Sequence, residues 1–301
     1  MLDYSQLEAL AAVVREGSFE AAARALHITP SALSQRMARL EHRVGGVLVL
    51  RARPCRATPL GEPLLRHAQQ VALLEQALPQ LAAPRAARTG PAMPAAQATL
   101  AIAVNADSLS TWFLPAVARL AQHQGLLLDL RVDDEGHTQE LLRRGEVLAA
   151  VTTHAAPVQG CRSLRLGRLR YRASASPAFV RQHFPQGLSA AALAQAPLLR
   201  FNAKDEMQHR WLRRLTRRAL QPPCHRLPSS TGFVQACEAG LGWALNPEPL
   251  LRDALAAGRL VDLAPEHPFD VPLHLQISRL PLSALQTLAD ALRAAAQLAL
   301  H

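Results

Sequence analysis

The sequence predicts a multi-domain protein. An N-terminal winged helix-turn-helix domain, all-α apart from a small wing, precedes a long linker helix and a C-terminal α/β domain of two doubly wound lobes. Three observations lead to this prediction. Residues 18–43 read as two short helices joined by a tight turn, an apolar stripe runs through residues 60–81, and strand-like and helix-like segments alternate beyond residue 98. At 301 residues the chain suits a small domain joined to a larger one.

The helix-turn-helix prediction rests on apolar residues at helical spacing, which would let two helices pack against a preceding one. These residues are Leu7, Leu10, Val13, Val14, Phe19, Ala22, Ala23, Leu26, Leu33, Met37 and Leu40. The other face of the second helix carries hydroxyl, amide and guanidinium groups, which can bond phosphate oxygens and base edges. The expected DNA contacts there are Thr29, Ser31, Ser34, Gln35, Arg36 and Arg39. A generic three-helix unit with a solvated polar face is the alternative.

A two-stranded wing is predicted after these helices, in residues 48–51 and 53–58. Its basic side chains, Arg51, Arg53 and Arg56, would lie against the DNA backbone or in the minor groove. A basic hairpin that takes no part in binding is the alternative. Together with the three helices, the wing sets the expected DNA-binding domain at residues 1–58.

Residues 59–97 are predicted to form a linker and dimerisation helix followed by a hinge. Thr58-Pro59 marks a helix start, with a hydroxyl N-cap and a proline in the first turn. Apolar residues then recur every three or four positions: Leu60, Leu64, Ala68, Val71, Leu74, Leu78 and Leu81. Such a stripe suits an antiparallel helix pair from two subunits, although a helix packed only on its own chain would also need one. Residues 85–97, rich in Ala, Pro and Gly, read as the hinge.

Residues 98–301 are predicted to form the α/β domain, because strands alternating with helices are typical of parallel, doubly wound sheets. Strands are expected at 99–104, 126–132, 147–152, 169–173, 198–201, 242–245 and 273–277. Helices are expected at 111–124, 138–144, 177–183, 206–219, 230–239 and 283–300. We place lobe I at about 98–166 and 268–301, and lobe II at about 167–267.

A small-molecule site is expected beyond the carboxyl ends of the strands, near helix N-termini. The candidate residues there are Asn105, Asp107, Ser108, Asp134, Thr152, Thr153, Ser229 and Ser230. Ser108, Thr152 and Ser230 would hold a carboxylate, and Asp107 and Asp134 a cation, which together suit a zwitterion with a cationic side chain. Each segment alone could equally be a helix cap or a turn.

The composition is strongly basic, with 33 Lys+Arg against 23 Asp+Glu and a formal net charge of +10. This balance suits a polyanionic partner, because phosphate neutralisation drives non-specific DNA affinity. Lys204 is the only lysine, and every other cation is arginine. Arginine favours bidentate contacts with phosphate and guanine, but the bias also fits a GC-rich coding sequence.

Other chemistries have little support in the sequence. Cys55, Cys161, Cys224 and Cys237 show no CxxC pair or metal-like grouping with histidine, so no metal or cofactor is expected. No nucleophile–base arrangement or phosphate loop stands out, which argues against an enzyme. Neither a leader segment nor an apolar run of membrane-spanning length is visible, so a cytoplasmic protein without membrane contact is expected.

The run from Gly17 to Glu41, continued by Gly45, Leu48, Arg51 and residues 58–61, resembles the helix-turn-helix signature of LysR-type transcriptional regulators. The resemblance continues at lower density through the rest of the chain. It implies an effector domain similar to periplasmic binding proteins, with two lobes connected by crossing strands around a cleft.

A closer resemblance, to the ArgP/LysG subgroup of that family, is carried by residues 103–115, 132–135, 138–147 and 229–235. It implies a regulator that senses lysine or arginine and activates genes for basic amino-acid export. The chain departs from the subgroup at Asn202, where an acidic residue is usual, and in the wing around Cys55. These departures bear on which amino acid the effector domain binds and on which operator sequence the DNA-binding domain recognises.

The leading hypothesis is therefore a ligand-responsive transcription factor. Its expected partners are double-stranded promoter or operator DNA, a lysine or arginine effector, a second copy in a homodimer that pairs into a tetramer, and RNA polymerase. The alternatives are a LysR-type regulator of another small carboxylate, an enzyme with an appended DNA-binding module, and an architectural DNA binder without a ligand. Activator or repressor action stays open.

Overall fold

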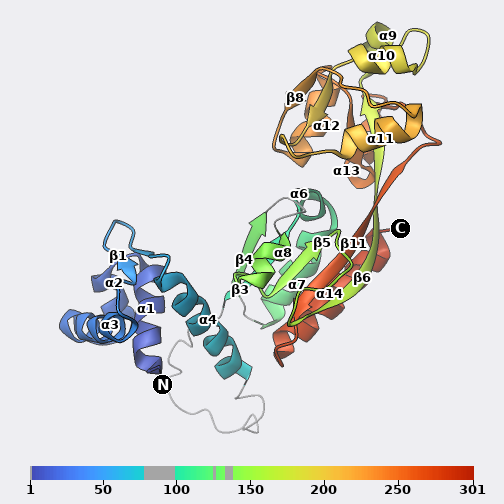
Figure 1. Ribbon diagram of the computed structural model, residues 1–301. Coiled ribbons are helices and arrows are strands. Elements are labelled where there is room, and N and C mark those ends of the chain that lie inside the picture. Colours follow the sequence, from blue (N-terminus) through green and yellow to red (C-terminus); the bar gives the residue numbers. More distant parts are fainter. Residues whose placement is uncertain (1, 78–98, 125–126, 133–137) are drawn as a thin grey trace. The chain divides into compact units, whose positions relative to one another are not determined.

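The computed structural model describes residues 2–77, 99–124, 127–132 and 138–301 (Figure 1). The described chain divides into two compact units, one made of residues up to 100 and the other of residues 101–124 and 128–301. Each unit has its own buried core, so we describe each by itself.

The first unit contains three short helices, a hairpin and a longer helix. These are α1 (Tyr4–Glu16), α2 (Phe19–Ala25), α3 (Pro30–Val44), β1 (Val49–Leu50), β2 (Arg56–Ala57) and α4 (Gly61–Ala77). The side chains of Asp3, Ser18 and Thr29 each accept a hydrogen bond from a backbone N–H two or three residues further on, at 2.9, 3.1 and 3.2 Å. Such N-caps satisfy donors that the first helical turn leaves unpaired. They explain why α1, α2 and α3 begin where they do.

The core of the first unit confirms the predicted packing of the helices. Leu10, Val13, Leu33 and Leu40 are completely buried in one cluster. The wing is tied to the α1–α2 turn, where the N–H of Cys55 donates to the carbonyl of Gly17 at 2.8 Å. Gly17 has a φ of +69°, and an added Cβ would meet Pro54 at 3.0 Å. Both the left-handed backbone and the close approach require glycine there.

The start of α4 agrees with the expected capping role of Thr58. Its Oγ1 donates to the carbonyl of Val47 at 2.7 Å and accepts from the N–H of Gly61 at 3.1 Å. Leu64 and Leu65 pack against the core of the first unit, and Ala68 is buried. The first turns of α4 therefore pack on their own chain, which was the alternative reading of the stripe. Further along, Leu74 is 38% exposed, and Leu78 and Leu81 lie outside the described residues.

The second unit alternates strands and helices. Its first half comprises β3 (Thr99–Val104), α6 (Ala106–Ser108), the π-helix η1 (Leu109–Phe113), α7 (Leu114–Gln124), β4 (Leu127–Val132), α8 (Thr138–Arg143), β5 (Ala149–Thr152) and β6 (Cys161–Ala175). Next come α9 (Pro177–His183), α10 (Ala190–Gln195), β7 (Leu198–Arg200), α11 (Met207–Thr216), β8 (Cys224–Arg226) and α12 (Ser230–Glu238). The chain ends with β9 (Ala244–Pro247), α13 (Glu248–Ala256), β10 (Val261–Asp262), β11 (Phe269–Ser278) and α14 (Ser283–Ala299).

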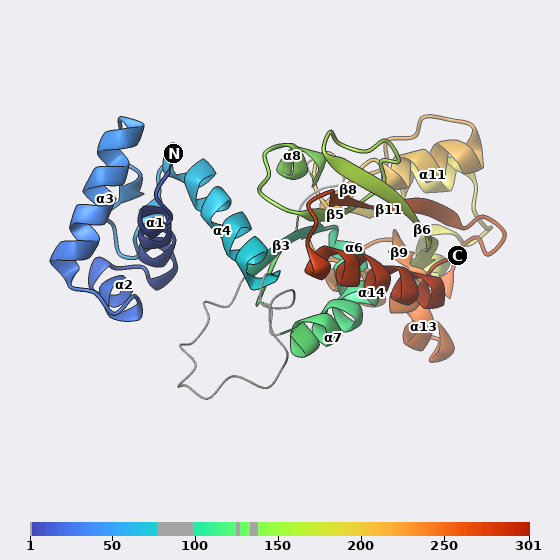
Figure 2. The same ribbon diagram turned by 90° about the horizontal axis from the view of Figure 1, so that it is seen from below.

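Two long strands connect the lobes of this unit. In the seven-stranded sheet the order is β10-β6-β11-β5-β3-β4, and β9 also pairs with β6. β6 and β11 are antiparallel, and both extend across the lobe with α7, α8 and α14 and the lobe with α9 to α13, in opposite directions (Figure 1). Figure 2 shows α7 and α14 on one face of the first lobe's strands and α8 on the other. The crossing strands implied by the family resemblance are therefore β6 and β11.

Several elements differ from the sequence-based expectation. The expected strands 169–173 and 273–277 are parts of β6 and β11, which span 15 and 10 residues. Parallel pairing joins β3 to β5 and β7 to β8, whereas the strands between the lobes pair antiparallel. The expected helix 111–124 begins earlier, through α6 and η1, and the helices α10 and α13 were not predicted.

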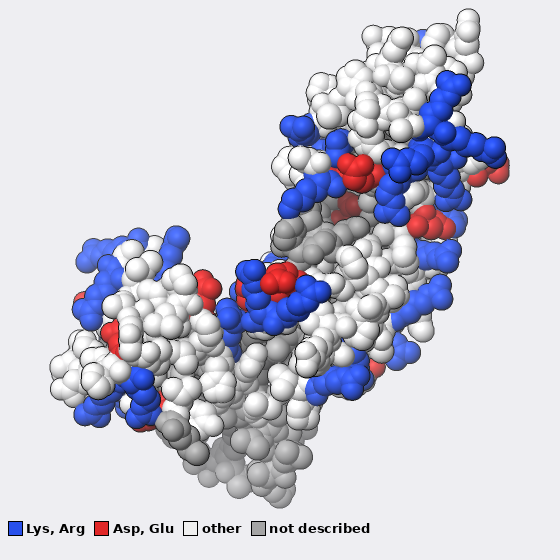
Figure 3. Space-filling model, in the orientation of Figure 1, with Lys and Arg blue, Asp and Glu red and all other residues white. Residues whose placement is uncertain are grey.

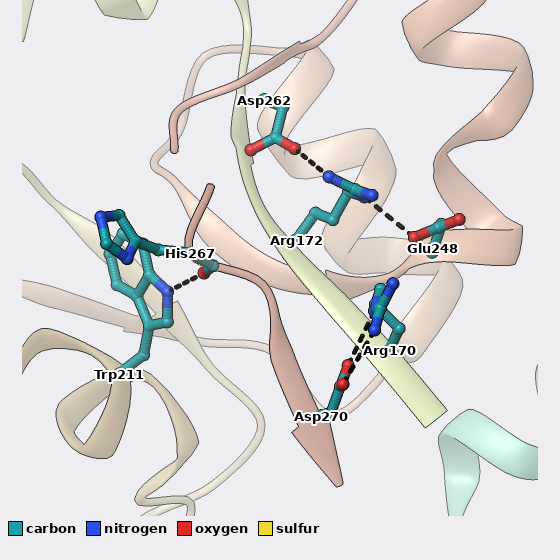
Figure 4. A network of polar contacts seen from close by, with 7 residues as sticks. All are labelled: Arg170, Arg172, Trp211, Glu248, Asp262, His267 and Asp270. Atoms are coloured by element: carbon teal, nitrogen blue, oxygen red, sulfur yellow. Dashed lines mark hydrogen bonds and ion pairs between the residues drawn. The ribbon is translucent and has the colours of Figure 1, made fainter. Parts of the chain in front are cut away.

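Arginines on β6 connect the crossing strand to its neighbours (Figure 4). Arg170 forms a bidentate pair with Asp270 of β11 at 2.8 and 2.9 Å, and this guanidinium holds the pKa of Asp270 below its usual value. Arg172 bonds Glu248 of α13 and Asp262 of β10, both at 2.9 Å. The side chains of Arg172, Glu248 and Asp262 are mostly buried. If one of them were removed, the remaining charges would have little water around them to replace the lost ion pair.

We predict that Arg172→Met lowers the free energy of unfolding by about 1–3 kcal/mol, because Glu248 and Asp262 both lose a charged donor. Arg143 is the matched control, since its ion pair with Glu140 lies on the surface, and Arg143→Met should change stability by less than about 0.5 kcal/mol. Urea unfolding of the three proteins measures this. Equal changes in the two variants would contradict the structural role of Arg172.

Candidate DNA-binding surface and ligand cavity

The exposed face of α3 carries polar side chains at four-residue spacing. Ser31, Gln35 and Arg39 are exposed and Ser34 is half-buried, whereas the opposite face packs into the core of the first unit. Residues four apart lie above one another on a helix. This arrangement presents a row of hydroxyl, amide and guanidinium groups along one side of α3.

Thr29 and Arg36 are placed differently from that row. Thr29 is the N-cap of α3, and its hydroxyl also lies 3.0 Å from that of Ser31. Arg36 is half-buried and lies close enough to the start of α1 to act on Asp3. Hydrogen bonds from Ser5 are the main cause of the lowered pKa of Asp3, and the charges of Arg43 and Arg36 add to them.

The wing exposes all three predicted arginines, Arg51, Arg53 and Arg56. Arg51 stacks over the ring of Phe19 at 4.6 Å, which fixes its position relative to the start of α2. In Figure 3, basic side chains gather over the wing. The first unit therefore has a basic hairpin beside a polar helix face, as a winged helix-turn-helix protein requires for backbone and groove contacts.

The second unit contains a cavity of about 680 Å³ between its lobes. Four of the predicted site residues line it: Asn105, Asp107, Thr153 and Ser230. Ser108, Thr152 and Ser229 belong to the same segments but lie outside its lining, and Asp134 lies outside the described residues. Sequence reasoning missed other lining residues, among them Phe201, Lys204, Arg210, Phe233 and Phe269.

Asp107 is the predicted site residue with the most distinctive environment. The hydroxyl of Tyr171, on β6, donates to its Oδ2 at 2.7 Å. Burial raises the pKa of the Asp107 carboxyl, the hydroxyls of Ser230 and Tyr171 lower it, and the nearby Asp205 charge raises it. A cation entering the cavity would favour the ionised form of this buried carboxyl.

The other two carboxylates of the cavity wall are held by backbone N–H groups or by a cation. Asp205 accepts from the N–H of Phe201 at 2.9 Å and from that of Met207 at 3.0 Å. Glu206 pairs with Arg200 at 3.1 Å. Among the described residues, Asp107 is therefore the cavity carboxylate best suited to a cationic ligand group.

Several predicted site residues serve as caps, which was the alternative reading of these segments. Asn105 Oδ1 accepts from the N–H of Ser108 at 2.9 Å, and Ser229 Oγ accepts from that of Gly232 at 3.1 Å. Thr152 Oγ1 accepts from the N–H of His154 at 3.3 Å. A cap and a ligand-binding group need the same residue types, so the sequence alone could not separate the two roles.

Two general properties of the described residues complete the description of the site. They contain no cluster of three or more His, Cys, Asp or Glu side chains that could hold a metal ion. Within the same parts of the chain, no helix is long and apolar enough to cross a membrane.

Comparison with known proteins agrees with this arrangement. Residues 4–62 match the family of bacterial regulatory helix-turn-helix proteins of the lysR type, and residues 95–297 match the LysR substrate binding domain. The transcriptional regulator LysG of Mycobacterium tuberculosis is 46% identical over 296 residues, covering 98% of this chain and 94% of LysG.

Solved structures show the same likeness over the full length. The crystal structure of ArgP from Mycobacterium tuberculosis is similar with a TM-score of 0.75 and 45% identity, covering 98% of both chains. Full-length LysG from Corynebacterium glutamicum, with its effector Arg bound, has a TM-score of 0.66 and 40% identity and covers all of both chains.

A helix-turn-helix domain joined to a substrate-binding domain defines a DNA-binding transcriptional regulator. The chain belongs to the LysR family of these regulators. The expectation of a regulator rather than an enzyme is thereby confirmed, as is the resemblance to the ArgP/LysG subgroup.

Proposed function

We propose that this regulator senses lysine or arginine in the cavity between its lobes and controls genes for basic amino-acid export. The observation that carries the proposal is Asp107, a carboxylate of the cavity wall that accepts a hydrogen bond from the Tyr171 hydroxyl. The bound Arg in LysG from Corynebacterium glutamicum supports the same ligand class. Asn105, Thr153 and Ser230, which also line the cavity, would complete the polar contacts.

The proposal includes assembly and location. Residues 59–97 would join two copies into a dimer, with residues 1–58 binding DNA and residues 98–301 the effector. Dimers would pair into a tetramer on promoter DNA and act on RNA polymerase in the cytoplasm. The exposed Leu74 on α4 supports the first of these steps, because a large apolar side chain beyond the packed part of a helix suits a subunit contact.

We expect Gln35→Ala to weaken binding to the specific operator by about 1–3 kcal/mol, because the exposed amide can form paired hydrogen bonds with a base edge. Binding to random DNA should barely change. Arg53→Ala provides the contrast, since a phosphate contact should weaken both kinds of binding alike. Fluorescence anisotropy with both DNAs measures this, and an equal loss on both for Gln35→Ala would contradict base readout.

Leu74→Glu should split the dimer, because a charge in an apolar helix contact would be buried without a partner. The control is Gln69→Glu, which adds the same charge at an exposed polar position of the same helix and should leave the dimer intact. Sedimentation velocity reports the assembly state directly. A Leu74→Glu protein that sediments like the wild type would show that α4 does not form the subunit contact.

Asp107→Asn should reduce arginine or lysine affinity tenfold or more, since a hydrogen bond to a charged group contributes about 1.5–3 kcal/mol. DNA binding without the ligand should survive. The exposed Asp253 of α13 provides the control variant, Asp253→Asn. Titration calorimetry measures the affinity of the wild type and of both variants for arginine and lysine. Unchanged affinity in Asp107→Asn would refute the cationic-effector proposal.

The affinity should also depend on pH in a defined direction. Burial raises the pKa of Asp107 above its usual value, and a bound cation would favour the ionised form. Affinity should therefore be full above this raised pKa and fall as the pH drops through it. Asp107→Asn should remove this fall, whereas the same fall in the variant would assign it to another group.

A further inference from the structure

The single lysine of this chain lies at the ligand cavity. Of 33 Lys+Arg residues, 32 are arginine, and the exception, Lys204, lines the cavity between the lobes. A compositional preference for arginine would act equally at every position. The one lysine lies in a wall of 19 residues out of 301, so it places an ammonium group at the ligand cavity.

The loop that carries Lys204, between β7 and α11, is held by its own side chains. Arg200 donates to the carbonyl of Asp205 at 2.8 Å and to that of Ala203 at 2.9 Å. Asn202 Oδ1 accepts from the N–H of Lys204 at 2.7 Å and from that of Asp205 at 3.1 Å. The carboxylate of Asp205 also accepts from the backbone N–H groups of Phe201 and Met207, which lie before and after it in the chain. These hydrogen bonds hold the backbone of the loop at Lys204.

Lys204 and Asp107 come from different lobes and carry opposite charges. Asp107 follows β3 in one lobe, and Lys204 follows β7 in the other. Both residues line the same cavity, together with Asp205, which is next to Lys204 in the sequence. A zwitterion with a cationic side chain could therefore bind one group in each lobe.

We propose that Lys204 is a specificity-determining residue that binds the α-carboxylate of the effector and restricts the site to ligands with a free carboxylate. This inference rests on the proposed function. The lysine ammonium is compact and carries three donors on a flexible stem, so it can follow a carboxylate as the lobes close. A decarboxylated ligand would leave Lys204 beside an uncompensated cation, which adds a repulsive component to the selection.

Arg210 is the other cation of the cavity wall and the matched comparison. Its guanidinium lies 5.4 Å above the ring of Phe269 on β11. Arg210 also belongs to α11 and not to the loop that carries Lys204. If any cation of the cavity wall could bind the α-carboxylate of the effector, neutralising Lys204 or Arg210 would lower the affinity for arginine equally.

The test compares arginine with agmatine, which is arginine without its carboxylate, in calorimetric titrations of the full-length protein. Wild type should bind arginine at least tenfold more tightly than agmatine. Lys204→Gln should lose tenfold or more in arginine affinity and keep its agmatine affinity within threefold, which removes the preference. Lys204→Arg should restore part of it, and Arg210→Gln should change it by less than threefold.

The outcomes separate this inference from the proposed function. Wild type that binds neither lysine nor arginine would refute both. Wild type that prefers arginine while Lys204→Gln keeps that preference, or loses affinity for both ligands equally, would refute the role of Lys204 alone. Loss of the preference in Arg210→Gln instead would assign the carboxylate to Arg210.

The lone lysine allows a second, chemical test. Acetic anhydride can acetylate only one side-chain amine in this protein, besides the amine at the chain's start, and mass spectrometry locates the product. Arginine and agmatine also carry an amine that consumes the anhydride, so acetylation of Lys204 is measured relative to that of the amine at the chain's start. Saturating arginine should lower this ratio at least fivefold, whereas agmatine should not. Equal ratios with and without arginine would overturn the proposal.

Discussion

The antiparallel pairing of β6 with β11 is the constraint on which the second unit depends. Its register runs from Phe269 opposite Tyr171 to Ser278 opposite Cys161, with one irregularity next to Leu273. Both strands extend from one lobe to the other. The hydrogen-bonded pairing of β6 with β11 therefore determines how the two lobes are placed on either side of the cavity. Tyr171, which bonds Asp107, lies on β6, and Phe269 of the cavity wall lies on β11.

The charged side chains on β6 also favour this register of β6 with β11. Arg170 and Asp270 are directly opposite each other in the ladder, so a one-residue slip would turn the two side chains to different faces. Arg172, two residues along β6, holds α13 and β10 through Glu248 and Asp262. Partly buried charges without partners raise the free energy of the folded state, so these pairs disfavour other registers. They also hold α13 and β10 in place in the second lobe.

The local elements of the fold could be predicted from the sequence, and the long-range ones could not. α3 was predicted because a capping Thr29, a proline in the first turn and helical apolar spacing all act within one segment. The first half of β6, from Cys161 to Arg168, was not predicted. That half is a strand because it pairs with β11, about a hundred residues later, and no local pattern records such pairing.

The candidate site shows the same limit at the level of single residues. The sequence placed polar segments at the ends of strands, and Asn105, Asp107, Thr153 and Ser230 do line the cavity. It could not show that Asp205 is bonded to backbone N–H groups while Asp107 faces hydroxyl groups, because those partners come from the fold.

Lys204 is different, because its signal was present in the composition. The chain uses arginine at every other basic position, and an ammonium group differs from a guanidinium group in its size and in the arrangement of its donors. In the structure, that lysine lines the same cavity as the carboxylate of Asp107. An effector with one charge for each lobe would bind best where both lobes contribute to its contacts, and its binding would thereby favour one arrangement of the two lobes over others.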